Sequence, residues 1–200
     1  MIHHALALFM NPPRAWQRVR DADPPASLTL ATHTLPLALI CATCGFIGTT
    51  TIGWRIGARP AIHLTEASAA GMAVAFFLAM TVATLTVGAM IKWMGQTYGA
   101  TRPFARCFAL ASLSGTPLFL VGIVLLYPVL WLDLLIGLPA LAYTIYVFYS
   151  GVAVMMEVPT ERAFLFASAV MAFGLVALVA VLAVSVLLWS AGVGPAFTTG

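Results

Sequence analysis

Two short patterns in the chain carry side chains that do chemistry in other proteins. Cys41 and Cys44 form a Cys-x-x-Cys motif, which elsewhere serves as a redox pair or as half of a zinc site. Here the motif lies inside an apolar run, with no second pair and no basic group nearby to activate a thiol. We therefore interpret both cysteines, together with Cys107, as small packing residues.

The second pattern is His63 and Glu66, whose i, i+3 spacing can serve one metal ion in a helical bundle. No other apolar run supplies a matching carboxylate, so we interpret the pair as a solvated loop and helix start. His33, near one end of the first apolar run, is interpreted as an interfacial residue. The sequence thus predicts neither a metal site nor a cofactor.

The remaining acidic groups lie at the edges of apolar runs rather than inside them. Asp133, Glu157 and Glu161 fall at such boundaries, as does Arg162. Ion-coupled transporters and proton pumps usually place an ionisable group at membrane depth. The sequence also has no phosphate-binding loop, nucleophile elbow or His-Glu-x-x-His motif. We expect no catalytic residues and no enzyme.

The amino-acid composition indicates which kind of fold holds these residues in place. Hydrophobic residues make up 62% of the 200 and charged residues 8%, against roughly 25% charged in an ordinary soluble domain. Lipid accepts apolar side chains on the outside of a helix bundle, whereas water does not. The sequence therefore predicts an all-α polytopic membrane bundle, and its scattered basic residues indicate topology rather than nucleic-acid binding.

Five apolar runs are long enough to cross a bilayer, which takes about 20 residues each. A polar arm (1–28) comes first, then a transmembrane domain (29–192) and a short tail (193–200). The predicted spans are about 28–54, 67–92, 104–126, 134–156 and 163–190. Thr65 is the predicted N-cap of the second. The arm lacks the long apolar stretch of a signal peptide, so we expect no cleavage.

The arm is predicted to form a short helix on the membrane surface. Arg14 and Arg18 are four residues apart and share one helical face, with Trp16 at headgroup depth. Together with Arg20, these arginines are expected to contact anionic lipid headgroups.

The distribution of cations predicts the orientation, because positively charged loops stay in the cytoplasm. With the N-terminus inside, seven of the nine cations lie on the inner side and Arg55 and Arg59 lie outside. The inner seven are Arg14, Arg18, Arg20, Lys92, Arg102, Arg106 and Arg162. We therefore predict a cytoplasmic N-terminus and an outward C-terminus.

Small residues recur every four positions on two spans, and such stripes let helices approach closely in lipid. The first stripe is Cys41, Gly45, Thr49 and Gly53, and the second is Gly71, Ala75, Ala79 and Ala83. We predict that the two stripes pack against each other.

Tyr143, Tyr146 and Tyr149 line one side of the fourth span. Tyr149 is expected at an interface, whereas the deeper Tyr143 hydroxyl needs a partner. Pro117 and Pro139 are expected to kink the third and fourth spans. This predicts a candidate groove, lined by Ser112, Ser114, Thr116, Pro117, Tyr143 and Tyr146, whose third-span hydroxyls are the expected partners of Tyr143.

Four segments of the chain form recognisable motifs: Asn11-Pro-Pro-Arg-Ala-Trp, Ala111-Ser-Leu-Ser-Gly-Thr-Pro117-Leu-Phe-Leu, Tyr146-Val-Phe-Tyr-Ser-Gly151-Val-Ala-Val-Met155-Met and Glu157-Val-Pro-Thr-Glu-Arg-Ala163-Phe. Together they resemble the bacterial branch of the Ypt-interacting-protein (Yip) family of five-span membrane proteins. The last is similar to the family's junction before the final span, which makes Glu157, Pro159, Glu161 and Arg162 candidate family residues. The third span departs from the pattern, because Ser112, Ser114 and Gly115 stand where a Tyr often precedes the proline.

The resemblance implies five spans, a cytoplasmic N-terminus and a bacterial inner-membrane location. Eukaryotic relatives contact small GTPases through cytosolic arms, but the arm here has under 30 residues, so we do not transfer that function. We rank a non-enzymatic scaffold or interaction subunit first, a lipid-handling or small-solute carrier second and an intramembrane enzyme third. The expected partners are membrane lipids and either a second copy or another membrane protein.

Overall fold

The structure is a computed structural model that describes residues 7–55, 61–190, 194 and 196–198. Within these ranges every regular element is helical, apart from isolated β-bridges near one end of the bundle. Four helices are long and apolar enough to cross a membrane, and a bent helix pair makes a fifth span if its two parts cross as one. These findings confirm the predicted all-α membrane bundle.

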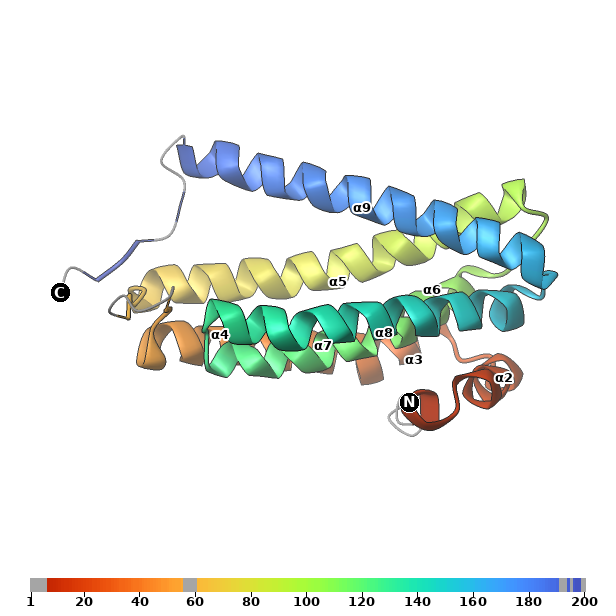
Figure 1. The fold of residues 1–200 in the computed structure, drawn as a ribbon, viewed down its shortest axis with the longest axis horizontal. Helices are drawn as coiled ribbons and strands as arrows, with labels where there is room; N and C mark the ends of the chain where they lie inside the picture. The colour runs from red at the N-terminus through yellow and green to blue at the C-terminus, as the bar shows by residue number, and fades with distance from the viewer. Residues whose placement is uncertain (1–6, 56–60, 191–193, 195, 199–200) are drawn as a thin grey trace.

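The elements follow one another as an arm and five successive spans (Figure 1). The arm holds α2 (Pro12–Ala22). The first span comprises α3 (Ala26–Thr29), a π-helical turn η1 (Leu30–Thr34), α4 (Leu35–Ile47) and a second π-helical turn η2 (Gly48–Ile52). The second span is α5 (Glu66–Thr97), and the third comprises α6 (Phe104–Ser114), α7 (Thr116–Val121) and a 3₁₀ turn η3 (Gly122–Leu126). The fourth span is α8 (Leu130–Met156) and the fifth is α9 (Thr160–Ser190).

Prolines explain one departure from regular α-helix in each of the first and third spans. Pro36 has no N–H to offer the carbonyl of Thr32, and η1 directly precedes it. Pro117 likewise leaves the Leu113 carbonyl without its usual donor, and the Thr116 hydroxyl donates to that carbonyl at 2.6 Å instead. The third span bends by 42° at this break.

Helix α5 begins as the sequence predicts. The Thr65 hydroxyl accepts a hydrogen bond from the Ser68 N–H at 3.4 Å, which confirms Thr65 as the N-cap.

The two small-residue stripes do not pack against each other, so that prediction is wrong. Gly45 faces Leu125 of the third span, and a Cβ added at Gly122 would overlap the Cys41 side chain. On α5, a Cβ added at Gly71 would meet nothing within 4 Å. The rest of the second stripe, Ala75, Ala79 and Ala83, is exposed as well. The first stripe is thus used inside the bundle, and the second faces outward.

The core lies toward the end of the bundle that carries α2. From Cys107 to Ser114, α6 is wholly buried, and it is surrounded by the arm, α5, α8 and the start of α9. Among the described side chains of α9, the buried ones lie in the first part, from Ala163 to Val170. The core therefore joins the arm to one half of the bundle.

Candidate functional site

A buried polar cluster joins the first span to the third. The ring of His33 lies 3.0 Å from the Ser112 hydroxyl through Nδ1 and 3.2 Å from the Thr116 hydroxyl through Nε2. The hydroxyl of Thr34 lies 2.8 Å from that of Ser112. All four side chains are buried. Because η1 is a π-helical turn, the adjacent residues His33 and Thr34 both reach the same serine.

Our prediction that His33 is interfacial is wrong, because its side chain is only 2% exposed and bonds inside the bundle. The sequence feature that could have indicated this buried contact is the spacing of polar residues around Pro36. Thr29, His33 and Thr34 are the polar residues before that proline that are buried. A regular helix would turn His33 and Thr34 about 100° apart, so sequence periodicity alone does not bring both onto one partner.

The six predicted groove residues fall into two groups. Ser112, Ser114, Thr116 and Pro117 are buried in the third span, whereas Tyr143 is half-buried and Tyr146 is exposed on the fourth. The expected bond from Tyr143 to a third-span hydroxyl is absent. Its hydroxyl instead donates to the Leu8 carbonyl at 2.9 Å, which has no helical donor of its own because Pro12 lacks an N–H.

The arm lies along α8 and reaches its midpoint. Tyr143, which binds Leu8, is thirteen residues from each end of α8, or about 20 Å at 1.5 Å per residue. Trp16 is fully buried and donates its indole N–H to the Val147 carbonyl at 3.1 Å. Trp16, predicted at headgroup depth, is packed inside the protein, because Gly151 leaves a notch in α8 that the indole fills.

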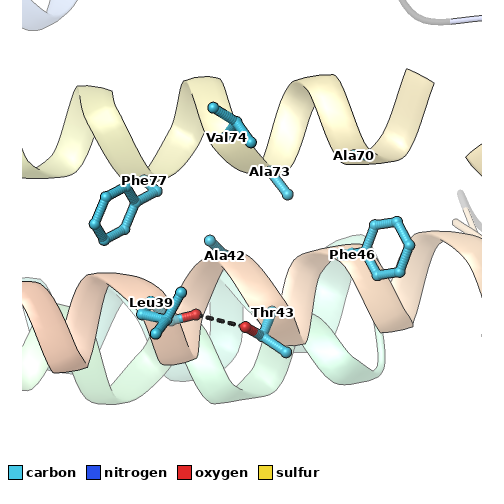
Figure 2. Close-up of a pocket in the computed structure, with 8 residues that line it drawn as sticks. All are labelled: Leu39, Ala42, Thr43, Phe46, Ala70, Ala73, Val74 and Phe77. Carbon is cyan, nitrogen blue, oxygen red and sulfur yellow. Dashed lines mark hydrogen bonds between the residues drawn. The ribbon is translucent and has the colours of Figure 1, made fainter. Parts of the chain in front are cut away.

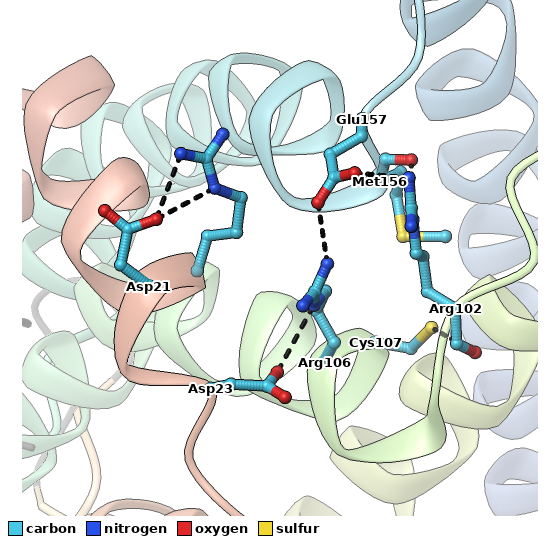
Figure 3. A network of polar contacts seen from close by, with 8 residues as sticks. Asp21, Asp23, Arg102, Arg106, Cys107, Met156 and Glu157 are labelled. Carbon is cyan, nitrogen blue, oxygen red and sulfur yellow. Dashed lines mark hydrogen bonds and ion pairs between the residues drawn. The ribbon is translucent and has the colours of Figure 1, made fainter.

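An ionic network lies at the end of the bundle that carries α2 (Figure 3). Arg106 contacts Asp23 of the arm at 3.3 Å and Glu157 at 2.8 Å. Arg102 contacts the other oxygen of Glu157 at 2.6 Å and also donates to the Met156 carbonyl. Glu157 has a positive φ of 52° at the C-cap of α8. Arg106 thus joins Asp23 of the arm to Glu157, and Glu157 joins the end of α8 to Arg102 and Arg106.

The other predicted junction and lipid residues lie outside this network. Pro159, Glu161 and Arg162 are exposed. Arg14 and Arg18 are exposed on the face of α2 that points away from its buried residues. Arg20 pairs with Asp21 at 3.0 Å. Arg59 lies outside the described residues.

Tyr149, expected at an interface, is half-buried, and its hydroxyl lies 2.8 Å from that of Ser168 on α9. The three cysteines are free and buried. Cys41 donates its thiol hydrogen to the Phe119 carbonyl at 3.0 Å. These contacts agree with the interpretation of the cysteines as packing residues.

An apolar pocket of about 310 Å³ lies between α4 and α5 (Figure 2). Its walls include Phe46 and Phe77 from the two helices. Thr43 supplies a hydroxyl, which is bonded to the Leu39 carbonyl at 2.8 Å. Such walls suit hydrocarbon, either an acyl chain or apolar side chains. Among the described residues, no three His, Cys, Asp or Glu side chains are grouped to hold a metal ion.

Comparison with known proteins places the chain in a family of membrane proteins. The model of the Yip1 domain matches residues 6–193, so the chain belongs to the Yip1 domain family. It is also 35% identical, over 189 residues, to "Inner membrane protein YohC" of Escherichia coli K12, covering 94% of this chain and 97% of that protein. The protein of the same name from Escherichia coli O6:H1 matches equally well.

No solved structure matches the chain. Together, the family, the relatives and the apolar helices identify an integral protein of the bacterial inner membrane.

Proposed function

We propose that this protein is a non-enzymatic scaffold or interaction subunit that binds a partner helix through α5. The observation that carries the proposal is the outward stripe Gly71, Ala75, Ala79 and Ala83, which the bundle itself does not use. Helices in lipid associate where small residues let their backbones approach. The partner is a second copy of the chain or another membrane protein.

The buried polar groups support a structural role rather than a catalytic one. His33, Ser112 and Thr116 bond to one another. An intramembrane enzyme needs a positioned acid, base or metal facing a substrate. Of the carboxylates that the structure describes, Asp23 and Glu157 are engaged by arginines at the end of the bundle.

A carrier is the second candidate function. One observation favours it: the Ser114 hydroxyl is buried on the third span with no hydrogen-bond partner among the described residues. Against it, the hydroxyls of Ser112, Thr116 and Tyr143 already have protein partners. A solute in the predicted groove would have to displace those bonds, so the carrier ranks below the scaffold.

The orientation we propose has the N-terminus in the cytoplasm and the C-terminus outside. Figure 1 shows α2, the α5–α6 connection and the α8–α9 junction at one end of the bundle, with the C-terminal segment at the other. The first end carries most of the cations. There, Arg14 and Arg18 are exposed and have no ion pair among the described residues, so they can bind anionic lipid phosphates, each worth about 1 kcal/mol. Arg20 is engaged by Asp21.

A photocrosslinking experiment in native membranes tests the scaffold proposal. A photoreactive amino acid is placed at Ala75, in the outward stripe, or at Gly137 of α8. Gly137 has nothing within 4 Å of an added Cβ and lies outside the stripe. We expect a discrete protein adduct from position 75 and lipid adducts from position 137. Lipid adducts from both positions would contradict the proposal.

A further inference from the structure

The pocket between α4 and α5 has the shape of a slot that runs along the two helices. Figure 2 shows the rings of Phe46 and Phe77 toward opposite ends, with Ala42 and Ala73 between them. On each helix the first and last lining residues are seven positions apart, which is about 10 Å at 1.5 Å per residue. The slot exists because the two alanines leave space that larger side chains would fill.

The slot lies within one half of the bilayer, toward the end of the bundle opposite α2. On α5 its deepest lining residue is Phe77, the twelfth of the 32 residues in that helix. Phe77 also packs against the buried cluster of Ala38, Cys41 and Phe119, so its ring closes the deep end. A slot of about 10 Å fits one leaflet, whose apolar part is about 15 Å thick. An acyl chain matches this length, whereas a partner helix would cross both leaflets.

The slot is open to the surrounding lipid along its side. Leu39 and Val74 line it and are 58% and 60% exposed. Helices in lipid approach closely where residues are small, so these two large side chains keep a partner helix away, and a flexible chain fits between them. Among the lining residues, Thr43 has the one polar side chain, and its hydroxyl is bonded to the Leu39 carbonyl at 2.8 Å. The walls therefore suit hydrocarbon rather than a polar solute.

This side of α5 is not the surface that we propose for a partner helix. At 100° per residue, Ala75 of the outward stripe points about 160° away from Ala73 of the slot. The inference drawn from the slot therefore goes beyond the scaffold proposal and does not depend on it.

A carboxylate lies beyond the shallow end of the slot. Glu66 comes four residues before Ala70, which puts both on the same face of α5, with Glu66 one turn nearer the membrane surface. The Glu66 side chain is exposed and has no ion pair among the described residues. Its negative charge attracts a headgroup ammonium and repels an anionic headgroup.

We propose that the slot binds one acyl chain of a zwitterionic phospholipid whose headgroup ammonium pairs with Glu66. The chain lies along α4 and α5 and reaches the ring of Phe77. It fills the space beside Ala42 and Ala73, and thereby adds apolar contact between the first and second spans.

The first test is native mass spectrometry of the full chain, released into mild detergent from nanodiscs with equal amounts of phosphatidylethanolamine and phosphatidylglycerol. We expect the parent to retain one phospholipid that Ala73→Phe, which fills the slot, has lost. Ala79→Phe, on the outward stripe, is the matched control and should retain it. No retained phospholipid on the parent, or the same number on Ala73→Phe, would overturn the proposal. If Ala73→Phe does not fold, Ala70→Phe replaces it, because Ala70 is exposed and lines the same slot.

The second test concerns the headgroup and uses the same mixture of lipids. The parent should hold phosphatidylethanolamine over phosphatidylglycerol by about twofold to fivefold, as expected for an exposed ion pair, and Glu66→Gln should hold both equally. Glu161→Gln removes an exposed carboxylate from the first turn of α9, at the other end of the bundle, and should leave the preference unchanged. Preferential retention of phosphatidylglycerol by the parent, or a preference that survives Glu66→Gln, would contradict the pairing.

The third test separates a lipid from a protein as the occupant of the slot. A photoreactive amino acid is placed at Val74 in native membranes, and we expect phospholipid adducts. A discrete protein adduct from position 74 would overturn the lipid site and leave the scaffold proposal standing. Lipid adducts alone from position 75 would count against the scaffold proposal and leave the lipid site standing.

Discussion

The two halves of α8 and α9 differ sharply in how they are packed. In the half that carries the arm, α8 buries Val147, Gly151 and Met155, and α9 buries Phe166. In the other half, every described side chain of α8 from Leu130 to Tyr146 and of α9 from residue 171 onward is at least partly exposed. The same apolar composition therefore supports a closed half, next to the arm, and an open half.

The difference shows what holds helices together in lipid, where apolar contact by itself gains little. The closed half contains directional contacts: the Trp16 indole on the Val147 carbonyl, and Arg106 between Asp23 and Glu157. Such contacts are sparse on the other parts of α8 and α9 that the structure describes. We infer that this half stays open because few polar contacts among the described residues commit it to the bundle.

The largest expected effect comes from filling the notch in α8. A Cβ at Gly151 would lie 2.6 Å from Trp16 Cε2 and 2.7 Å from Leu110 Cδ1. Gly151→Leu should destabilise the protein by about 1–3 kcal/mol and expose the arm to protease. Gly137→Leu, in the open half, should change neither. Unfolding in mixed micelles and limited proteolysis measure both, and equal effects would erase the contrast between the halves.

The ionic network should give a smaller effect. Arg106→Gln removes two ion pairs at a side chain that is 16% exposed, and we expect a loss of about 1 kcal/mol that shrinks at high salt. Arg18→Gln is the matched control, because Arg18 is exposed and has no ion pair among the described residues. Unfolding at two salt concentrations measures the difference. A salt-independent loss would contradict an electrostatic origin.

Tyr143→Phe should cost less again, about 0.6 kcal/mol, the average for a side-chain hydrogen bond inside a membrane protein. It leaves the Leu8 carbonyl without a donor, so proteolysis of the first residues should accelerate. Tyr146→Phe is the control, since that ring is 52% exposed and its hydroxyl has no partner among the described residues. Faster cleavage in both variants would show that the bond to Leu8 is not the cause.

The smallest effect is expected in the open half. Leu182, on α9, is 57% exposed, and Leu182→Ala should change the free energy of unfolding by less than about 0.5 kcal/mol. Unfolding of the purified chain in mixed micelles measures it. A loss comparable to that of Gly151→Leu would mean that the outer part of α9 is packed in the folded protein.

The sequence was a good guide to features set by local chemistry. Composition and run length predicted an all-α membrane bundle, and Thr65 before the second run predicted an N-cap. The motifs around Asn11 and Glu157 indicated the family. These features depend on residues close together in the chain.

Features that depend on distant pairs were missed. Two stripes of small residues are equally good surfaces for close approach. The sequence around each stripe does not indicate that one packs on the third span while the other faces out of the bundle. The partner of Tyr143 follows from the missing N–H of Pro12, which lies 131 residues away. Likewise, the π-helical turn that brings His33 and Thr34 to Ser112 is visible only once Pro36 is placed in the helix.

Native mass spectrometry of the protein released gently from its own membrane tests the central claim most directly. The parent chain is compared with Ala79→Leu, which fills the outward stripe, and with Gly137→Leu. We predict that a second copy or a defined partner protein stays bound to the parent and to Gly137→Leu and is lost from Ala79→Leu. Monomers in all three samples, or the same complex in all three, would contradict a partner surface on α5.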